Sequence, residues 1–116
     1  MNKKNFTHDT IYEIFERDYH ACRICKRKTL LETIPHHIFW KSQLFRACVN
    51  MAENGAVLCL NCHKVIHHAS TDAEVKQSKL FDKQLKEEAL AMFKGKIPEQ
   101  DYEELVKIFK SRGYTL

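Results

Sequence analysis

The pattern of hydrophobic and polar positions predicts short elements in the first half of the chain and longer helices in the second. Residues 9–18 (DTIYEIFERD) repeat isoleucine at an interval of three residues, followed directly by Phe15. This spacing is typical of a short amphipathic helix with one apolar face. Thr7 or Asp9 is placed to cap its first turn.

Two apolar segments further along predict first a strand or extended segment and then a short strand. Residues 33–40 (TIPHHIFW) are rich in β-branched and aromatic side chains, and Pro35 keeps them out of a central position in a sheet. Residues 56–60 (AVLCL) predict a second strand. The segment between them is mixed, and we expect a short helix at 42–48 and a turn at 54–55.

The second half of the chain predicts three helices, at 62–69, 72–94 and 98–111. The middle one mixes apolar positions with many charges, which suits an amphipathic helix with at most one break. Gly95 is expected to end it, and Pro98 to lie in the first turn of the last helix. The apolar positions of the last two helices are Val75, Leu80, Leu85, Leu90, Phe93, Leu105, Ile108 and Phe109.

Length and cysteine content place the protein in a broad class. A chain of 116 residues suits a single domain, and it contains five cysteines, an odd number. Its first residues (MNKKNFTHDT) do not resemble a signal peptide, and no stretch approaches the roughly 20 apolar residues of a membrane span. We therefore expect a cytoplasmic protein without a membrane segment, whose paired cysteines bind metal instead of forming disulfides.

The excess of positive over negative charge lies entirely in the first part of the sequence. Residues 1–68 hold ten Lys/Arg and six Asp/Glu, a net charge of +4, whereas residues 69–116 hold nine of each. An excess of positive charge favours a polyanionic partner such as nucleic acid. An ordinary solvated surface explains a charge of this size about equally well.

Two Cys-x-x-Cys pairs are the most specific motif in the chain. Cys22 and Cys25 form the first pair and Cys59 and Cys62 the second, with 33 residues between them. Four thiolates on two tight turns are typical of a structural zinc site, in which no coordination position stays open for a substrate. The alternatives are redox-active or unligated thiols. Cys48 has no partner in this arrangement and is expected to be a small buried residue.

Five of the seven histidines lie between the cysteine pairs or soon after them. The doublet His36-His37 is in a predicted strand, where successive side chains point to opposite faces. His63 and His67 share one face of a predicted helix, at the i, i+4 spacing of helical metal ligands, and His68 follows. One residue of the doublet is therefore placed to bind a metal while its neighbour faces a substrate. Taken singly, each histidine also fits an ordinary surface or capping role.

Together these motifs resemble a known family of nucleases. The strings PHHIF and NGAVLCLNCHKVIH, preceded by IFERDYHACRIC, are similar to the HNH endonucleases. Their ββα-metal (His-Me finger) core is stapled in many members by a four-cysteine zinc site. The resemblance implies an α+β fold with a nuclease core at 9–69. The short helix predicted at 9–18 precedes the first cysteine pair and is counted in this range. It does not explain residues 70–116, which we expect to form a helical extension packed on the core.

The resemblance also implies roles for individual residues. His36 would be the first ligand of a catalytic divalent metal, at a position where many members have aspartate. His63 would be the second ligand and His67 the third. His37 would be the general base that takes a proton from the attacking water, and Asn54 would brace the loop that carries this base.

These residue types suit the hydrolysis of phosphodiester bonds in DNA. A neutral imidazole with an ordinary pKa of about 6.5 is a usable general base at neutral pH. A divalent ion on imidazole ligands (Mg²⁺, Mn²⁺, Ni²⁺ or Zn²⁺) stabilises charge on the phosphate and assists the leaving oxygen. The expected contacts to the DNA backbone are Lys26, Arg27, Lys28, Lys41, Arg46 and Lys64.

Two other interpretations fit part of the sequence. A non-catalytic zinc-binding module that binds nucleic acid or protein explains the cysteines and the positive charge. It leaves the histidine doublet and Asn54 without a role. A nuclease that acts as a toxin or accessory subunit is also compatible with the sequence. Its charge-balanced helices at 72–111 would then take part in a homodimer or bind a protein partner.

Overall fold

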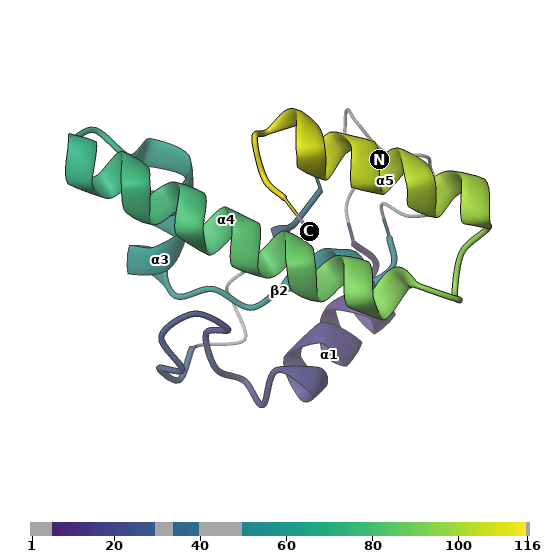
Figure 1. The fold of residues 1–116 in the computed structure, drawn as a ribbon. Helices are drawn as coiled ribbons and strands as arrows, with labels where there is room; N and C mark the ends of the chain where they lie inside the picture. Colours follow the sequence, from purple (N-terminus) through teal and green to yellow (C-terminus); the bar gives the residue numbers. More distant parts are fainter. Residues whose placement is uncertain (1–5, 30–33, 40–49, 116) are drawn as a thin grey trace.

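The structure, a computed structural model, describes residues 6–29, 34–39 and 50–115 (Figure 1). These residues form helices and a two-stranded antiparallel sheet, so the prediction of a mixed α+β fold is confirmed. In chain order the elements are α1 (His8–Arg17), β1 (His36–His37), the 3₁₀ helix η2 (Ala52–Asn54), β2 (Gly55–Ala56), α3 (Leu60–His68), α4 (Asp72–Phe93) and α5 (Glu99–Ser111). The short helix predicted at 42–48 lies outside the described residues.

Helix α1 forms where the apolar spacing predicts it. Thr7 caps it, because its hydroxyl accepts a hydrogen bond at 3.3 Å from the N–H three residues further on. Ile14 and Phe15 are fully buried on its inner face. Asp18 follows the last turn and accepts a hydrogen bond from the Val57 N–H at 2.9 Å. This bond ties the end of the helix to the chain beyond β2.

Strand β1 (His36–His37) covers only part of the strand or extended segment predicted at 33–40, and β2 (Gly55–Ala56) reaches only the first residue of the strand predicted at 56–60. They pair over two residues each. The ladder does not continue through Phe39, because the side-chain amide of Asn54 bonds both the N–H and the C=O of that residue. Helix α3 begins at Leu60, so the strand predicted at 56–60 is wrong over most of its length. The Asn54 side chain therefore ends the ladder after β1, and the start of α3 at Leu60 ends the extended segment after β2.

Helix α4 is the longest element and runs across the molecule without a break (Figure 1). A capping box between Thr71 and Glu74 starts it, and Gly95, with a left-handed φ of 81°, follows its end. Leu85 is fully buried, whereas Leu80 is 67 % exposed, so not every apolar position of this helix faces the core. A separation of five residues turns a helix by about 140° beyond one full turn, which puts these two leucines on different sides.

The larger of the two buried apolar clusters among the described residues combines side chains from both halves of the sequence. They come from the first cysteine turn, the segments around β1 and β2, the start of α3, the second half of α4, and α5 with the chain after it. The cluster consists of Cys22, Ile38, Phe39, Ala56, Leu58, Cys59, Cys62, Leu85, Ala89, Leu90, Phe93, Leu105, Phe109 and Tyr114. A smaller cluster lies between α1 and the η2–β2 segment.

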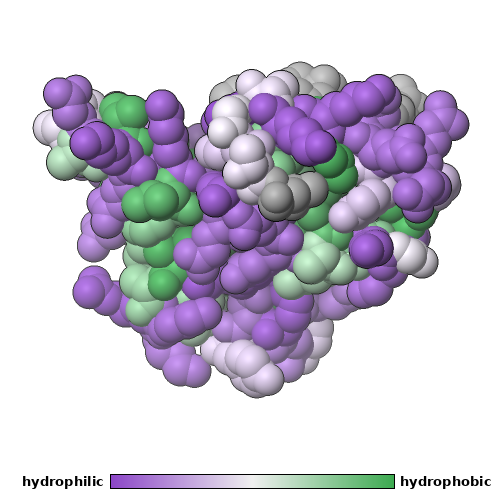
Figure 2. Space-filling model, in the orientation of Figure 1, coloured by the Kyte–Doolittle hydropathy of each residue, from purple (hydrophilic) through white to green (hydrophobic). Residues whose placement is uncertain are grey.

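Helix α5 packs against α4 and begins at Glu99, because Pro98 occupies the N-cap position instead of the first turn. The face in Figure 2 is mostly hydrophilic, and apolar side chains show at the end that holds α3 and the first half of α4 and again on the side of α5. Val75 and Leu80, in that half of α4, are both exposed. Among the described residues, no helix has the length and apolar character that crossing a membrane requires.

Gly55 in β2 lies directly against Ile14 of α1. A Cβ at this position would overlap the Cδ1 methyl of Ile14 and lie 3.0 Å from Cζ of Phe6. We expect Gly55→Ala to lower the free energy of unfolding by about 1–3 kcal/mol through overpacking. Ile14→Val removes the obstructing methyl, so the same glycine substitution should cost less in that background. Urea unfolding of the two single variants and the double variant measures this, and strictly additive costs would contradict the explanation.

Candidate metal centres

Two groups of side chains are each close enough together to hold a metal ion. The cysteine group consists of Cys22, Cys25, Cys59 and Cys62, and the histidine group consists of His36, His63 and His67. Within each group, one possible ligand atom per residue lies within 4.8 Å of the others. The sequence places all seven residues in metal sites, and the structure brings the members of each group together.

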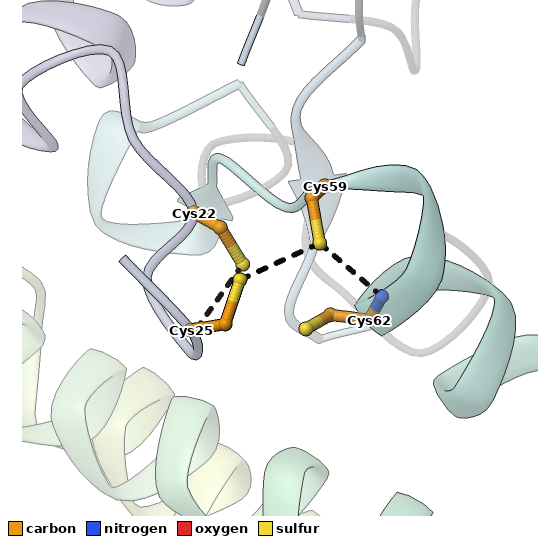
Figure 3. Close-up of side chains that lie close together, drawn as sticks. All are labelled: Cys22, Cys25, Cys59 and Cys62. Carbon is orange, nitrogen blue, oxygen red and sulfur yellow. Dashed lines mark hydrogen bonds between the residues drawn. The ribbon is translucent and has the colours of Figure 1, made fainter. Parts of the chain in front are cut away.

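The four thiols of the cysteine group gather around one centre (Figure 3). All four are free of disulfides, and the Sγ atoms of Cys25 and Cys59 are 3.6 Å apart. Two thiolates bound at about 2.3 Å to one tetrahedral zinc ion are about 3.8 Å apart, so the observed spacing suits a shared ion. Four thiolate donors form a closed coordination shell, which is typical of a structural site.

Both cysteine pairs are built into tight backbone turns. In the first turn, the Cys22 N–H donates to a carbonyl across the turn at 2.8 Å, and Lys26 adopts a left-handed φ of 66°. In the second, Cys59 is the N-cap of α3, and its Sγ accepts a hydrogen bond from the Cys62 N–H at 3.4 Å. The cysteine group therefore fixes the start of the helix that carries two residues of the histidine group.

The ionisation of the cysteine group favours a bound cation. Burial acts to raise the pKa of Cys22, but hydrogen bonds from backbone N–H groups outweigh it and lower this pKa to about 7. Burial, together with the neighbouring thiols, raises the pKa of Cys62. Thiolates this close together repel one another strongly, and a divalent cation at their centre removes that repulsion.

The histidine group joins the sheet to α3. His36 lies in β1 opposite Ala56 and is buried, whereas His63 and His67 reach solvent from successive turns of α3. The Nδ1 of His36 is 3.2 Å from the Nε2 of His67. Two imidazole nitrogens on one tetrahedral zinc ion are about 3.3 Å apart, so these nitrogens can share an ion. Because two of its three residues are at the surface, an ion held here would be open to water and to a substrate.

The pKa values of the histidine group favour neutral imidazoles at pH 7. Burial, followed by the charges of His67 and His63, lowers the pKa of His36 to about 3. Burial is also the largest cause that lowers the pKa of His63 and of His67 from the ordinary value of 6.5. A neutral imidazole has a lone pair to donate to a metal, and a protonated one does not.

The affinity of the histidine group for a divalent metal is therefore expected to change little between about pH 8 and pH 7. Protons compete with the metal only below the pKa of the free ligands, and all three of these pKa values lie below 6.5. The affinity should fall as the pH drops below that value. Calorimetric titration of Ni²⁺ into zinc-loaded protein at a series of pH values tests this. A tenfold loss between pH 8 and pH 7 would contradict it.

His37, the second residue of the doublet, lies outside the histidine group. Because side chains alternate along a strand, it points to the opposite face from His36. Its ring stacks on Phe6, with 3.8 Å between the ring centroids and 2° between the ring planes. This stacking contact fixes the plane of the His37 ring.

Asn54 bonds the backbone that directly follows the doublet. Its fully buried side chain accepts from the Phe39 N–H at 2.8 Å and donates to the Phe39 carbonyl at 3.2 Å. Its own backbone carbonyl accepts from the Ile38 N–H at 2.8 Å. This geometry is suited to holding the chain next to His37 in a fixed position.

The basic residues predicted to contact DNA are exposed wherever the structure describes them. These residues are Lys26, Arg27 and Lys28 in the first cysteine turn and Lys64 in α3. Lys41 and Arg46 lie outside the described residues. His68 lies next to the histidine group, with its ring centroid 6.4 Å from that of His67, but it is not a member.

Two contacts near the histidine doublet, made by Phe6 and Lys86, are not predicted from the sequence. Phe6 stacks on His37, and Lys86 of α4 donates to the Ile38 carbonyl at 2.7 Å. Phe6 directly precedes the N-cap residue of α1, and an apolar residue at this position often packs against the helix it precedes. This position is the one sign in the sequence that Phe6 is buried. Lys86 is one charge among many on α4, and such a side chain is normally expected in solvent.

The protein was also compared with known proteins. No protein-family model, no curated protein and no solved structure matches the chain. What the two candidate metal centres do is therefore inferred from their own geometry and chemistry.

Proposed function

We propose that this protein is a metal-dependent endonuclease of the HNH type that hydrolyses phosphodiester bonds in DNA. The observation that carries the proposal is the convergence of His36, His63 and His67 on one point, with His37 next to His36 in strand β1. A closed cysteine group at the start of α3 supports it, because a structural ion there would hold the histidine-bearing helix in place.

The order of the elements agrees with this proposal. An antiparallel pair of strands supplies His36, and the following helix α3 supplies His63 and His67, in the order that the proposed ββα-metal core requires. In this proposal residues 9–69 are the nuclease core, and residues 70–116 are a helical extension packed on it within one domain. The zinc ion of the cysteine group has no open position and takes no part in the reaction.

Each residue of the proposed site has a different role in the reaction. His37 takes a proton from the attacking water on a ring nitrogen, and its stack on Phe6 keeps that ring in one plane. Asn54 keeps the chain next to His37 in position through three hydrogen bonds. A divalent ion held by the histidine group supplies, when bound, positive charge for the phosphate and the leaving oxygen. Imidazole donors favour Zn²⁺ or Ni²⁺, and Mg²⁺ or Mn²⁺ are the other candidates.

The exposed basic residues supply the proposed contacts to DNA. Lys26, Arg27 and Lys28 directly follow the first cysteine pair, and Lys64 is exposed on the helix of the histidine group. Contacts from such side chains to phosphates position a duplex without recognising its sequence. We therefore expect cleavage with little sequence preference and a strong dependence on salt.

Conversion of supercoiled plasmid to the nicked form tests the proposed function. The protein is loaded with one equivalent of Zn²⁺, and then Mg²⁺, Mn²⁺, Ni²⁺ or further Zn²⁺ is added in separate reactions. The proposal expects nicking that needs the second ion and stops when that ion is withdrawn. One tightly bound zinc per chain and no nicking with any added ion would favour the non-catalytic zinc-binding module instead.

A further inference from the structure

A buried ionic network connects α4 and the C-terminal segment to the chain beside the histidine doublet. Lys86 is fully buried, and Asp82, one turn earlier in α4, is 4 % exposed. The Lys86 Nζ donates to Asp82 Oδ1 at 2.6 Å and to the Ile38 carbonyl at 2.7 Å. The other oxygen of Asp82 accepts from the Tyr114 hydroxyl at 2.7 Å and from the Arg112 Nε at 2.9 Å.

Stability alone does not explain this network. Removing two charges from water costs several kcal/mol per ion, and well-packed apolar side chains of similar volume often replace a buried pair without loss of stability. The surrounding core is apolar, and the nearby Leu85, Ala89 and Phe93 of α4 are buried. A lysine in this position is therefore better explained by the group to which it donates.

That group is the carbonyl of the residue directly after the doublet. The Ile38 N–H is bonded to the Asn54 carbonyl, and both backbone groups of Phe39 are bonded to the Asn54 side chain. The Ile38 carbonyl is the remaining backbone group of these two residues, and Lys86 bonds it. The ammonium group also lies 5.3 Å from the centre of the Phe39 ring. Asn54 and Lys86 together thus hold every backbone polar group of this pair of residues.

We propose that Lys86 is a positioning residue, which sets the place of His36 in the histidine group and of His37 beside it. The role in the reaction rests on the proposed nuclease function, whereas the role at the histidine group does not. In this proposal the C-terminal part of the chain contributes to the site. Helix α4 supplies Lys86, and the C-terminal segment supplies Tyr114 and Arg112, which bond Asp82, the ion-pair partner of Lys86.

Lys86→Met tests the proposal, because it keeps the volume of the side chain and removes the donor. Asp82 keeps Tyr114 and Arg112 as partners in this variant. Lys86→Gln, one atom shorter, keeps an N–H donor without the charge. Lys83→Met is the matched control, since Lys83 lies on the exposed side of the same helix in an ion pair with Glu87.

Two measurements are made on zinc-loaded protein. Circular dichroism first establishes that each variant is folded, and zinc analysis that it holds one zinc ion per chain. Co²⁺ is titrated into the histidine group, giving an affinity and a visible d–d spectrum that reports ligand geometry. The kcat and KM of plasmid nicking are measured in parallel. We expect Lys86→Met to lose about 10- to 100-fold in Co²⁺ affinity or in kcat, with KM for DNA nearly unchanged and an altered spectrum. Lys86→Gln should fall between Lys86→Met and the wild type, and Lys83→Met should match the wild type.

A folded Lys86→Met protein with the wild-type Co²⁺ spectrum, affinity and kcat would overturn the proposal. If Lys86→Met fails to fold, Lys86→Gln carries the same test, and wild-type values for that variant would overturn it. If the wild type binds Co²⁺ but does not nick DNA, the proposed nuclease function fails. In that case an altered spectrum in Lys86→Met still supports the positioning role, so the two failures are distinguishable.

Discussion

His37→Ala is expected to lower the rate of plasmid nicking by about 10²- to 10⁴-fold, the usual contribution of a general base. His37 lies outside both candidate metal groups, and its ring stacks on Phe6. Its removal should therefore leave both metal sites intact. The fold, the zinc content and the affinity of the histidine group for a second ion are expected to stay close to those of the wild type.

Single-turnover nicking with enzyme in excess measures the loss, because product release then does not mask it. His68→Ala is the matched control, since His68 lies next to His67 at the end of α3 but belongs to neither metal group. We expect this control to nick at the wild-type rate. Equal rates for His37→Ala and the wild type would remove the role assigned to His37. Loss of the second ion in His37→Ala would make His37 a ligand instead.

Cys59→Ser is expected to lose the structural ion and most of the folded structure. Cys59 is both a member of the cysteine group and the N-cap of α3. Serine is among the best N-cap residues, so this substitution keeps the cap and removes the thiolate. Binding of a structural zinc ion contributes about 10–16 kcal/mol in zinc-finger peptides, and even part of that exceeds the stability of a typical small domain.

Thermal unfolding followed by circular dichroism, with zinc measured by a colorimetric chelator, detects this loss. His63→Ala is the comparison variant, because it removes one residue of the histidine group from the same helix. It should keep one tightly bound zinc and a cooperative melt while losing the second ion. A cooperative melt for Cys59→Ser at the wild-type temperature, with one zinc per chain, would refute the structural role of the cysteine group.

The two metal groups could be predicted from the sequence because their geometry is largely local. Two residues between cysteines define a turn that presents both thiols, and an i, i+4 pair of histidines projects from one side of a helix. The association of the first cysteine pair with the second, and of His36 with α3, is non-local. Spacing therefore indicates the cysteine group and the pair His63 and His67, whereas the choice of His36 as their partner comes from the resemblance to the HNH endonucleases.

The parts that could not be predicted depend on contacts between distant segments. The strand through Phe39 is cut short by a side chain 15 residues away, that of Asn54, and alternation of residue types does not reveal such a bond. Lys86 and Ile38 are 48 residues apart, and their contact exists only once α4 packs on the sheet. The same packing decides that Leu85 faces the core and Leu80 does not.

The most direct test is to measure nicking rate and metal occupancy together while a divalent ion is titrated into protein that already holds one zinc. We expect no cleavage when only the cysteine group is filled. The rate should then rise in proportion to occupancy of the histidine group and level off when that group is full. Full activity with only the first zinc bound, or no cleavage when both groups are filled, would contradict the division into a structural and a catalytic metal centre.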